Sequence, residues 1–236
     1  MIRTLIIDDE QHARDEMAAL LADTGEFELL GTCANAMEAI KAINRDRPEV
    51  IFLDVNMPVL SGFDLLGMID QERMPYVIFV TAYDEYALKA FEEKTLDYLL
   101  KPVEPERLEM AIRKIKGALE GGSQQSFEPH PLTRIPCVTA NRVRLIDLVQ
   151  IEYVHSDLSG VHVVGGGTES YTELTLKILE ARSSLTRCHR QYLVNPDQID
   201  EITLLEHGLA EIRTRSGQRL PVSRRYLKRL KELLSF

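Results

Sequence analysis

Three carboxylates follow short apolar runs in the first half of the 236-residue sequence. Asp8 and Asp9 come directly after Leu5–Ile7, and Asp54 comes directly after Val50–Leu53. If the two runs are neighbouring parallel strands, the three carboxylates meet at one edge of the sheet, where like charges about 4 Å apart repel by roughly 4 kcal/mol. Such a cluster needs a cation, and an all-oxygen ligand set favours Mg²⁺. The spacing therefore predicts a magnesium site.

Two further side chains extend the predicted pocket. Thr81 and Lys101 each end another apolar run. A hydroxyl, an ammonium group and metal-held carboxylates suit a transferred phosphoryl group, because phosphoryl transfer requires mainly positioning and charge neutralisation. The Lys101–Pro102 peptide bond is expected to be cis, since cis is accessible mainly before proline. The alternative is that Asp8 and Asp9 only cap a following helix, which leaves Thr81 and Lys101 unexplained.

Alternating periodicities predict the elements that position these groups. Over about 120 residues, apolar β-branched runs alternate five times with stretches of helical spacing. Repeated strand–helix units indicate a parallel sheet covered on both faces, and we expect a flavodoxin-like doubly wound five-stranded sheet of order 2-1-3-4-5. The predicted strands are Leu5–Ile7, Leu29–Leu30, Val50–Leu53, Val77–Val80 and Leu96–Leu100.

The pattern changes after a polar segment that contains glycine and proline. We interpret residues 119–132 as a linker between a domain of residues 1–118 and a domain of residues 133–236. Beyond the linker, alternation of period two predicts a mainly β fold with helices at Thr172–Ala181 and Arg224–Leu234. The predicted strands are Val143–Leu145, Ile151–Val154, Val161–Val164, Ile199–Leu205, Leu209–Arg213 and Arg219–Val222.

The net charge of −9 is unevenly divided. Residues 1–132 carry −12 and residues 133–236 carry +3. The segment Ile212–Lys231 has eight basic residues and no acidic one, and a second basic group lies at Arg187–Arg190. Basic clusters on loops are typical of proteins that bind the nucleic-acid backbone, and arginine can also read guanine in the major groove. The alternative is an ordinary solvated surface.

Several other classes of protein are not expected. No apolar run approaches the roughly 18 residues of a membrane span, and the N-terminus does not have the pattern of a signal peptide. We therefore expect a cytoplasmic protein without direct membrane insertion. Cys33, Cys137 and Cys188 form no CxxC pair, so neither a zinc site nor a disulfide framework is expected.

The first 118 residues resemble a response-regulator receiver domain. The motifs that carry the resemblance are Asp8-Asp9, Asp54-Val-Asn-Met-Pro58 with Gly62, Thr81-Ala82 and Lys101-Pro102. It implies that a sensor histidine kinase phosphorylates Asp54 in the presence of Mg²⁺, that the protein is not an enzyme in the usual sense, and that it forms a homodimer through about residues 84–119. The implied site comprises the metal ligands Asp8, Asp9, Asp54 and the backbone carbonyl of Asn56, the phosphoryl contacts Thr81 and Lys101, and the aromatic switch Tyr98.

A phosphohydrolase of the haloacid-dehalogenase type is the alternative for this half. Such enzymes also place a nucleophilic aspartate, a threonine and a lysine around Mg²⁺. They require a second aspartate two residues after the nucleophile as general acid. That position is Asn56, whose side chain has no acidic proton to donate.

Residues 133–236 resemble a LytTR DNA-binding domain, in which loops of a β fold contact DNA. The resemblance is carried by Ile151-Glu-Tyr-Val154, the segment Arg187–Asn195 and the segment Pro221–Lys228. The implied DNA-binding residues are Arg224, Arg190, His189, Arg187, Arg225, Ser159 and Gly160. The two halves together resemble LytTR two-component response regulators, which bind promoter DNA and regulate transcription. The alternative is a signalling adaptor whose second half binds protein.

Overall fold

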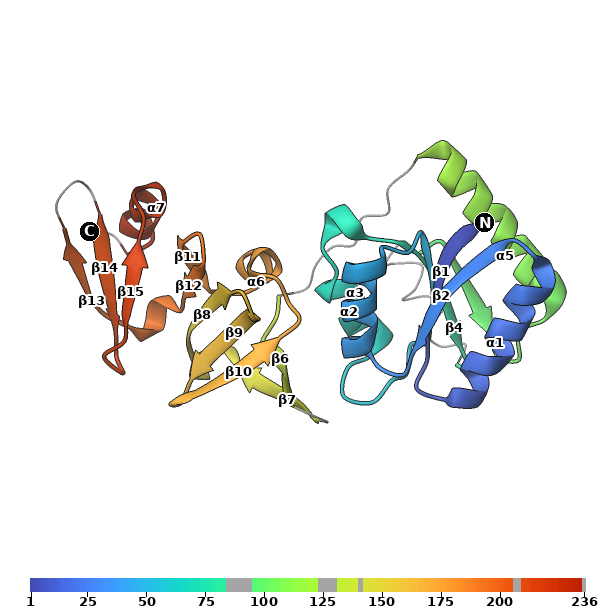
Figure 1. The fold of residues 1–236 in the computed structure, drawn as a ribbon, viewed down its shortest axis with the longest axis horizontal. Coiled ribbons are helices and arrows are strands. Elements are labelled where there is room, and N and C mark those ends of the chain that lie inside the picture. The colour runs from blue at the N-terminus through green and yellow to red at the C-terminus, as the bar shows by residue number, and fades with distance from the viewer. Residues whose placement is uncertain (84–94, 123–130, 140–141, 206–208, 235–236) are drawn as a thin grey trace. The chain divides into compact units, whose positions relative to one another are not determined.

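The computed structural model describes residues 1–83, 95–122, 131–139, 142–205 and 209–234 (Figure 1). The chain divides into two compact units, Met1–Pro129 and His130–Phe236. Residues 84–94, which include the helical spacing expected before the fifth strand, lie outside the described residues, as does most of the predicted linker.

The first unit contains a five-stranded parallel sheet of order β2-β1-β3-β4-β5. This order confirms the flavodoxin-like fold predicted from the alternating periods. In the β1–β3 register Ile7 lies opposite Leu53, so the residues that follow both strands emerge at the same edge. The strands are β1 (Ile2–Ile7), β2 (Phe27–Cys33), β3 (Val50–Leu53), β4 (Tyr76–Thr81) and β5 (Asp97–Leu100).

Helices cover both faces of this sheet (Figure 1). Helices α1 (Gln11–Thr24) and α5 (Pro105–Gly121) share one apolar core with the strands, and α2 (Ala36–Asp46) and α3 (Gly62–Met68) pack against the other face. Local signals explain where α2 begins, because the Asn35 side chain accepts hydrogen bonds from the first turn. Strand β3 is buried along its whole length, as its continuous apolar sequence predicts.

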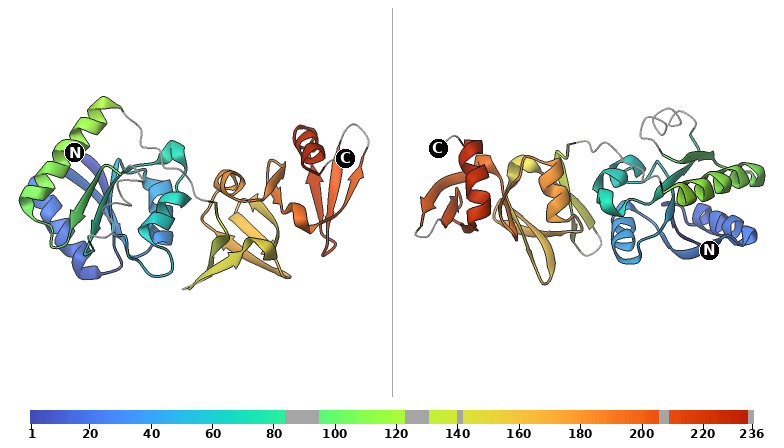
Figure 2. Two further views of the ribbon diagram at one scale, coloured as in Figure 1. Left: turned by 180° about the vertical axis from the view of Figure 1, so that it is seen from behind. Right: turned by 90° about the horizontal axis from the view of Figure 1, so that it is seen from above.

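The second unit is mostly β, which confirms its predicted class. A seven-stranded sheet has the order β11-β12-β8-β9-β10-β6-β7, and a three-stranded sheet has the order β13-β14-β15 (Figure 2). The strands are β6 (Arg134–Thr139), β7 (Arg142–Asp147), β8 (Ile151–Asp157), β9 (Gly160–Gly165), β10 (Thr168–Thr172), β11 (Thr186–His189), β12 (Tyr192–Val194), β13 (Ile199–Leu204), β14 (Ala210–Thr214) and β15 (Arg219–Val222).

Two α-helices are described in this unit. Helix α7 (Arg224–Leu234) has the predicted bounds, whereas α6 (Leu176–Arg182) begins later than predicted. The reason is that Thr172 still belongs to β10, where its buried hydroxyl donates to the Pro136 carbonyl at 2.7 Å. Thr175 then caps the shorter helix by accepting from the Ile178 amide.

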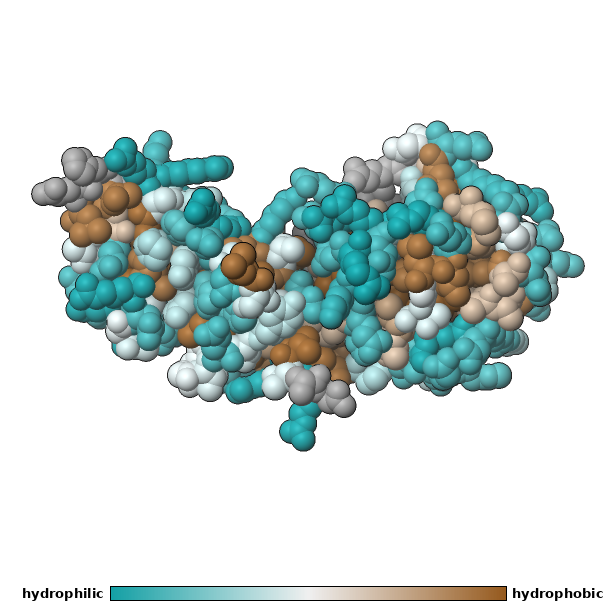
Figure 3. All heavy atoms as spheres, viewed as in Figure 1, coloured by the Kyte–Doolittle hydropathy of each residue, from teal (hydrophilic) through white to brown (hydrophobic). Residues whose placement is uncertain are grey.

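The surface of the chain is largely hydrophilic on the face drawn in Figure 3. Apolar side chains are nevertheless exposed at some loops, and Leu158 at the β8–β9 turn is fully exposed. Within the part of the chain that the structure describes, every helix is too short or too polar to cross a membrane.

Candidate functional site

An acidic pocket lies at the carboxyl edge of the parallel sheet. The Asp54 amide donates to the Ile7 carbonyl at 2.8 Å, which holds the end of β3 beside the end of β1. As a result, Asp8, Asp9 and Asp54 each offer a carboxylate oxygen, and these atoms lie within 4.8 Å of one another. Asp8 and Asp54 are buried, whereas Asp9 is exposed. The structure thus brings together the three carboxylates that the sequence placed after two strands.

Lys101 connects two of these carboxylates. Its Nζ lies 2.6 Å from Asp8 Oδ2 and 3.1 Å from Asp54 Oδ2. The lysine is positioned by the end of β5, where its amide donates to the Thr81 carbonyl at 2.9 Å. The following Lys101–Pro102 peptide bond is cis, as expected. One ammonium group therefore offsets part of the repulsion among three carboxylates.

The surroundings alter the acidity of both partners. Burial raises the pKa of Asp54, and the neighbouring Asp8 charge raises it further, although Lys101 opposes this change. For Lys101, burial acts to lower the pKa, but the contacts with Asp8 and Asp54 prevail and raise it. A more basic carboxylate is a better nucleophile, and a lysine with a raised pKa keeps its positive charge.

The loop after Asp54 is tightly fitted to it. The Asn56 amide donates to Asp54 Oδ1 at 3.3 Å, and the Gly62 amide donates to the Val55 carbonyl at 2.8 Å. A Cβ atom at Gly62 would lie 2.4 Å from the Asp54 carbonyl oxygen, so only glycine allows this close approach. Asn56 itself is exposed beside the pocket.

Thr81 and Tyr98 lie on neighbouring strands next to the pocket. Thr81 is fully buried, and its Oγ1 has no hydrogen-bond partner among the described residues. A buried hydroxyl without a partner is suited to contact a ligand oxygen. Tyr98 is partly buried, and its hydroxyl donates to the Tyr83 carbonyl.

An ion-pair cluster behind Tyr98 was not predicted from the sequence. Buried Asp97 accepts from both terminal nitrogens of Arg107, at 2.6 and 2.8 Å, and from Lys114 Nζ at 2.9 Å. Arg107 also donates to the Tyr98 carbonyl at 2.8 Å. Burial acts to raise the pKa of Asp97, but the hydrogen bonds from Arg107 and Lys114 prevail and lower it. The cluster anchors α5 to the strand that carries Tyr98.

The predicted basic residues of the second unit lie mainly on two elements. Arg190 is exposed in the turn between β11 and β12, and Arg224 and Arg225 are exposed at the start of α7. The Arg225 guanidinium lies 5.5 Å from the centre of the Tyr226 ring. The two elements are tied together because the Ser223 amide, just before α7, donates to the carbonyl of Cys188 on β11 at 3.1 Å.

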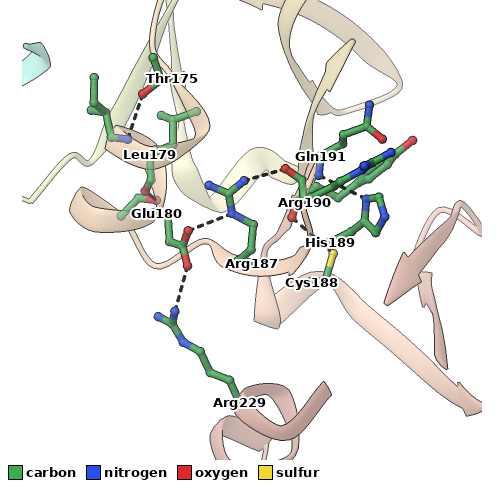
Figure 4. A network of polar contacts seen from close by, with 12 residues as sticks. Thr175, Leu179, Glu180, Arg187, Cys188, His189, Arg190, Gln191 and Arg229 are labelled. Carbon is green, nitrogen blue, oxygen red and sulfur yellow. Dashed lines mark hydrogen bonds and ion pairs between the residues drawn. The ribbon is translucent and has the colours of Figure 1, made fainter. Parts of the chain in front are cut away.

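Arg187 differs from these residues because its side chain is only 12% exposed. Its Nε donates to Glu180 Oε2 at 2.9 Å, and its Nη1 donates to the Arg190 carbonyl at 3.1 Å (Figure 4). Glu180 Oε1 also accepts from Arg229 Nη1 at 2.9 Å. The basic clusters in the sequence drew attention to the arginines of this network but not to the glutamate, which lies in the preceding short helix, seven residues from Arg187 and 49 from Arg229.

His189 is the last residue of β11 and directly precedes the same turn. Burial lowers its pKa, as does the charge of the adjacent Arg190. The Gln191 amide donates to His189 Nδ1 at 3.2 Å, so this nitrogen acts as an acceptor inside the turn (Figure 4).

The β8–β9 hairpin holds the two remaining predicted residues. Asp157 accepts from the Ser159 amide at 2.7 Å and from its hydroxyl at 2.6 Å, which restrains the turn. Gly160 has a φ angle of 132°, and a Cβ there would meet the Tyr171 ring at 2.4 Å. The turn therefore has a defined shape, but it contains no basic side chain.

Two family models match the chain. A response regulator receiver domain matches residues 4–113, and a LytTr DNA-binding domain matches residues 141–235. The chain therefore belongs to the response regulators that combine a receiver domain with a LytTR DNA-binding domain, a family of two-component transcription regulators.

Relatives with the same organisation are similar over almost the whole chain. A response regulatory protein of Vibrio vulnificus is 50% identical over 238 residues, which cover 99% of this chain and 98% of that protein. A response regulatory protein of Vibrio cholerae is 49% identical and covers all of both chains. The transcriptional regulatory protein BtsR of Escherichia coli is 45% identical over 99% of both chains. The likeness to the BtsR type that the segment Leu185–Asn195 indicates is thereby confirmed.

Proposed function

We propose that the protein is a phosphorylation-controlled regulator in which Asp54 accepts a phosphoryl group from a sensor histidine kinase. The observation that supports this proposal best is the acidic pocket, where three carboxylates meet and Lys101 contacts Asp8 and Asp54. An enzyme that hydrolyses phosphate esters is less well supported, because exposed Asn56 stands where a general acid would be needed.

The pocket is suited to Mg²⁺, because its ligands are all oxygen atoms. Asp8, Asp9, Asp54 and the Asn56 carbonyl would hold the ion, which would neutralise charge on the transferred group. Asp54 Oδ then attacks phosphorus as the bond to the kinase histidine breaks. Lys101 moves from its carboxylate partners to a phosphoryl oxygen, and the unpartnered Thr81 hydroxyl donates to another.

The signal then passes from the pocket to the surface of the first unit. When Thr81 turns toward the phosphoryl group, Tyr98 on the neighbouring strand changes its packing and shifts an existing conformational equilibrium. We propose that the face of about residues 84–119 then forms the homodimer contact. Residues 84–94 of this face lie outside the described residues. The Asp97–Arg107 pair supports the backbone of Tyr98 during this change.

We propose that the second unit binds promoter DNA chiefly through Arg224 and Arg190, which are exposed at the start of α7 and in the β11–β12 turn. Arg225 and the turn of Ser159 and Gly160 contact the phosphate backbone of the DNA. His189, whose Nδ1 accepts within its own turn, shapes that turn. Arg187 holds the turn as well, because its guanidinium is already paired and mostly buried.

One experiment tests the whole proposal. The full chain is incubated with acetyl phosphate and Mg²⁺, and its binding to promoter DNA from its own genome is measured by footprinting, with and without the phosphoryl donor. We expect one phosphoryl group per chain that alkali or hydroxylamine removes, as for an acyl phosphate, and protected sites whose occupancy rises on phosphorylation. Steady hydrolysis of phosphate esters would favour the phosphohydrolase, and a chain that binds DNA without sequence preference would favour the adaptor.

A further inference from the structure

A single glutamate joins the two basic elements of the second unit. Glu180 lies in α6 and accepts from Arg187 on β11 and from Arg229 on α7 (Figure 4). We propose that Glu180 is a positioning residue for DNA recognition, which holds the turn of Arg190 and the start of α7 in the arrangement that reads one DNA site. This inference rests on the proposed DNA binding of the second unit.

One arm of the network controls the turn. Arg187 Nε lies 2.9 Å from Glu180 Oε2, and its Nη1 lies 3.1 Å from the Arg190 carbonyl. The Arg187 side chain is 12% exposed and that of Glu180 is 22% exposed, so solvent screens this pair little. Because the guanidinium is planar and its donors have fixed directions, the position of Glu180 determines where the backbone of Arg190 lies.

The other arm controls the helix. Arg229 Nη1 lies 2.9 Å from Glu180 Oε1, and Arg229 follows Arg224 by five residues in the same helix. An α-helix moves as a rigid rod over so short a distance, so a tether at Arg229 restrains the direction in which Arg224 projects. The Ser223 amide, bonded to the Cys188 carbonyl at 3.1 Å, supplies a second tether at the start of the helix. With both tethers, α7 has a defined orientation relative to β11.

Electrostatics alone predicts the opposite role for this residue. A carboxylate close to a DNA-binding surface repels phosphates, so its removal should strengthen binding to any DNA. Glu180 is surrounded by two arginines, however, and the three side chains together retain one positive charge. If Glu180 positions the base-reading residues, its neutralisation must weaken specific binding even though the domain becomes more positive. Whether neutralising Glu180 weakens or strengthens specific DNA binding therefore distinguishes a positioning role from a purely electrostatic one.

The experiment compares Glu180→Gln with the matched control Glu232→Gln in the full chain. Glu232 is an exposed acid on α7, and its side chain is 67% exposed. The probes are a duplex selected by the wild-type protein from a random pool and a scrambled duplex of the same composition, both at fixed salt. For Glu180→Gln we expect a roughly tenfold fall in the ratio of selected to scrambled affinity, with affinity for scrambled DNA unchanged or higher. For Glu232→Gln we expect the wild-type ratio.

The outcomes distinguish the two levels of the proposal. If the wild-type protein yields no selected duplex, the proposed DNA binding fails. If it does, and Glu180→Gln keeps the wild-type ratio, the positioning role is wrong. Should Glu180→Gln lose its cooperative thermal unfolding, the comparison is made between Arg229→Met and Lys228→Met. Their side chains are 59% and 87% exposed, so both variants keep the core intact. Only Arg229→Met should lower the ratio, and equal ratios would overturn the inference.

Discussion

The two units contain charge clusters of the same design and opposite sign. In the first unit, one lysine contacts two aspartates, because Lys101 lies between Asp8 and Asp54. In the second unit, one glutamate contacts two arginines, because Glu180 lies between Arg187 and Arg229.

The two clusters differ in the sign of their net charge and in where that charge lies. In the first, Asp8 and Asp54 are buried and the exposed Asp9 adds a third carboxylate, so the pocket keeps an excess of negative charge that a small cation can neutralise. The second reaches the surface through Arg229, and its remaining positive charge faces solvent. The difference suggests that a like-charge excess inside a pocket serves chemistry on one small ligand, whereas a paired cluster at the surface fixes the geometry for a large one.

Removal of Asp54 from the acidic cluster should have the largest effect, because it removes the group on which the chemistry of the first unit depends. We expect Asp54→Ala to abolish phosphorylation by acetyl phosphate and Mg²⁺, because the nucleophile is lost, as measured by mass spectrometry of the intact chain. The control is Asp23→Ala, which removes an exposed carboxylate at a distance from the pocket and should be phosphorylated like the wild type. A full phosphoryl adduct on Asp54→Ala would contradict the assignment of the site.

Removal of Arg224 should give the next largest effect. If its exposed guanidinium reads a base, Arg224→Ala should weaken specific DNA binding by about 1–3 kcal/mol, as measured by titration at fixed salt. Lys228→Ala, on the same helix, is the matched control and should weaken selected and scrambled DNA alike, because an ammonium on the solvent face acts only on phosphates. An Arg224→Ala variant with wild-type discrimination would remove Arg224 from the recognition surface.

Asp97 tests whether charge pairing also stabilises the first unit. We expect Asp97→Asn to lower the free energy of unfolding by about 2 kcal/mol, since it leaves Arg107 partly buried without its partner. The lowered pKa of Asp97 means that this stability is present above the ordinary aspartate pKa and is lost as the pH falls through the lower folded value. Urea unfolding at several pH values measures both effects. Equal stability of the two proteins at pH 7 would show that the pair contributes nothing.

Neutralising Asp54 should have the smallest effect of the four, and it should stabilise the first unit, whereas neutralising Asp97 destabilises it. Because burial and Asp8 raise its pKa, the ionised carboxylate destabilises the fold at neutral pH. We expect Asp54→Asn to raise the free energy of unfolding by on the order of 1 kcal/mol in EDTA. The gain should shrink as the pH falls through the raised folded pKa toward the unfolded value, where the wild-type carboxyl is also neutral. A loss of stability at pH 7 would show that the pocket is not strained by its charges.

The fold of the first unit was predictable because its strands are continuous apolar runs separated by helical spacing. Four strands of the second unit, β6, β10, β11 and β12, were not predicted. Strand β6 contains Pro136, and β10 and β11 are mainly polar, so their sequences do not alternate clearly. They form strands because neighbouring strands supply their hydrogen-bond partners. Such tertiary pairing cannot be predicted from the local sequence.

The candidate sites were predictable to a similar extent. Each residue of the acidic pocket follows a strand, so the order of the strands was enough to bring them together. The partners of Asp97 and of Glu180 were not predictable, because these contacts join helices and strands whose spacing follows no short period. Arg187 shows the limit most clearly, since its basic character suggested a contact with DNA and only its burial indicates a different role.

The close approach of Gly62 to the backbone of Asp54 predicts which mutations abolish signalling. Any side chain at this position must displace the backbone of Asp54, since a Cβ would meet the Asp54 carbonyl oxygen at 2.4 Å and the Phe79 ring at 3.1 Å. A screen for loss-of-signalling alleles should therefore recover substitutions of Gly62 alongside those of Asp54, although glycine contributes no functional group. Such alleles would map the shape of the pocket, whereas alleles of the aspartates would map its charge.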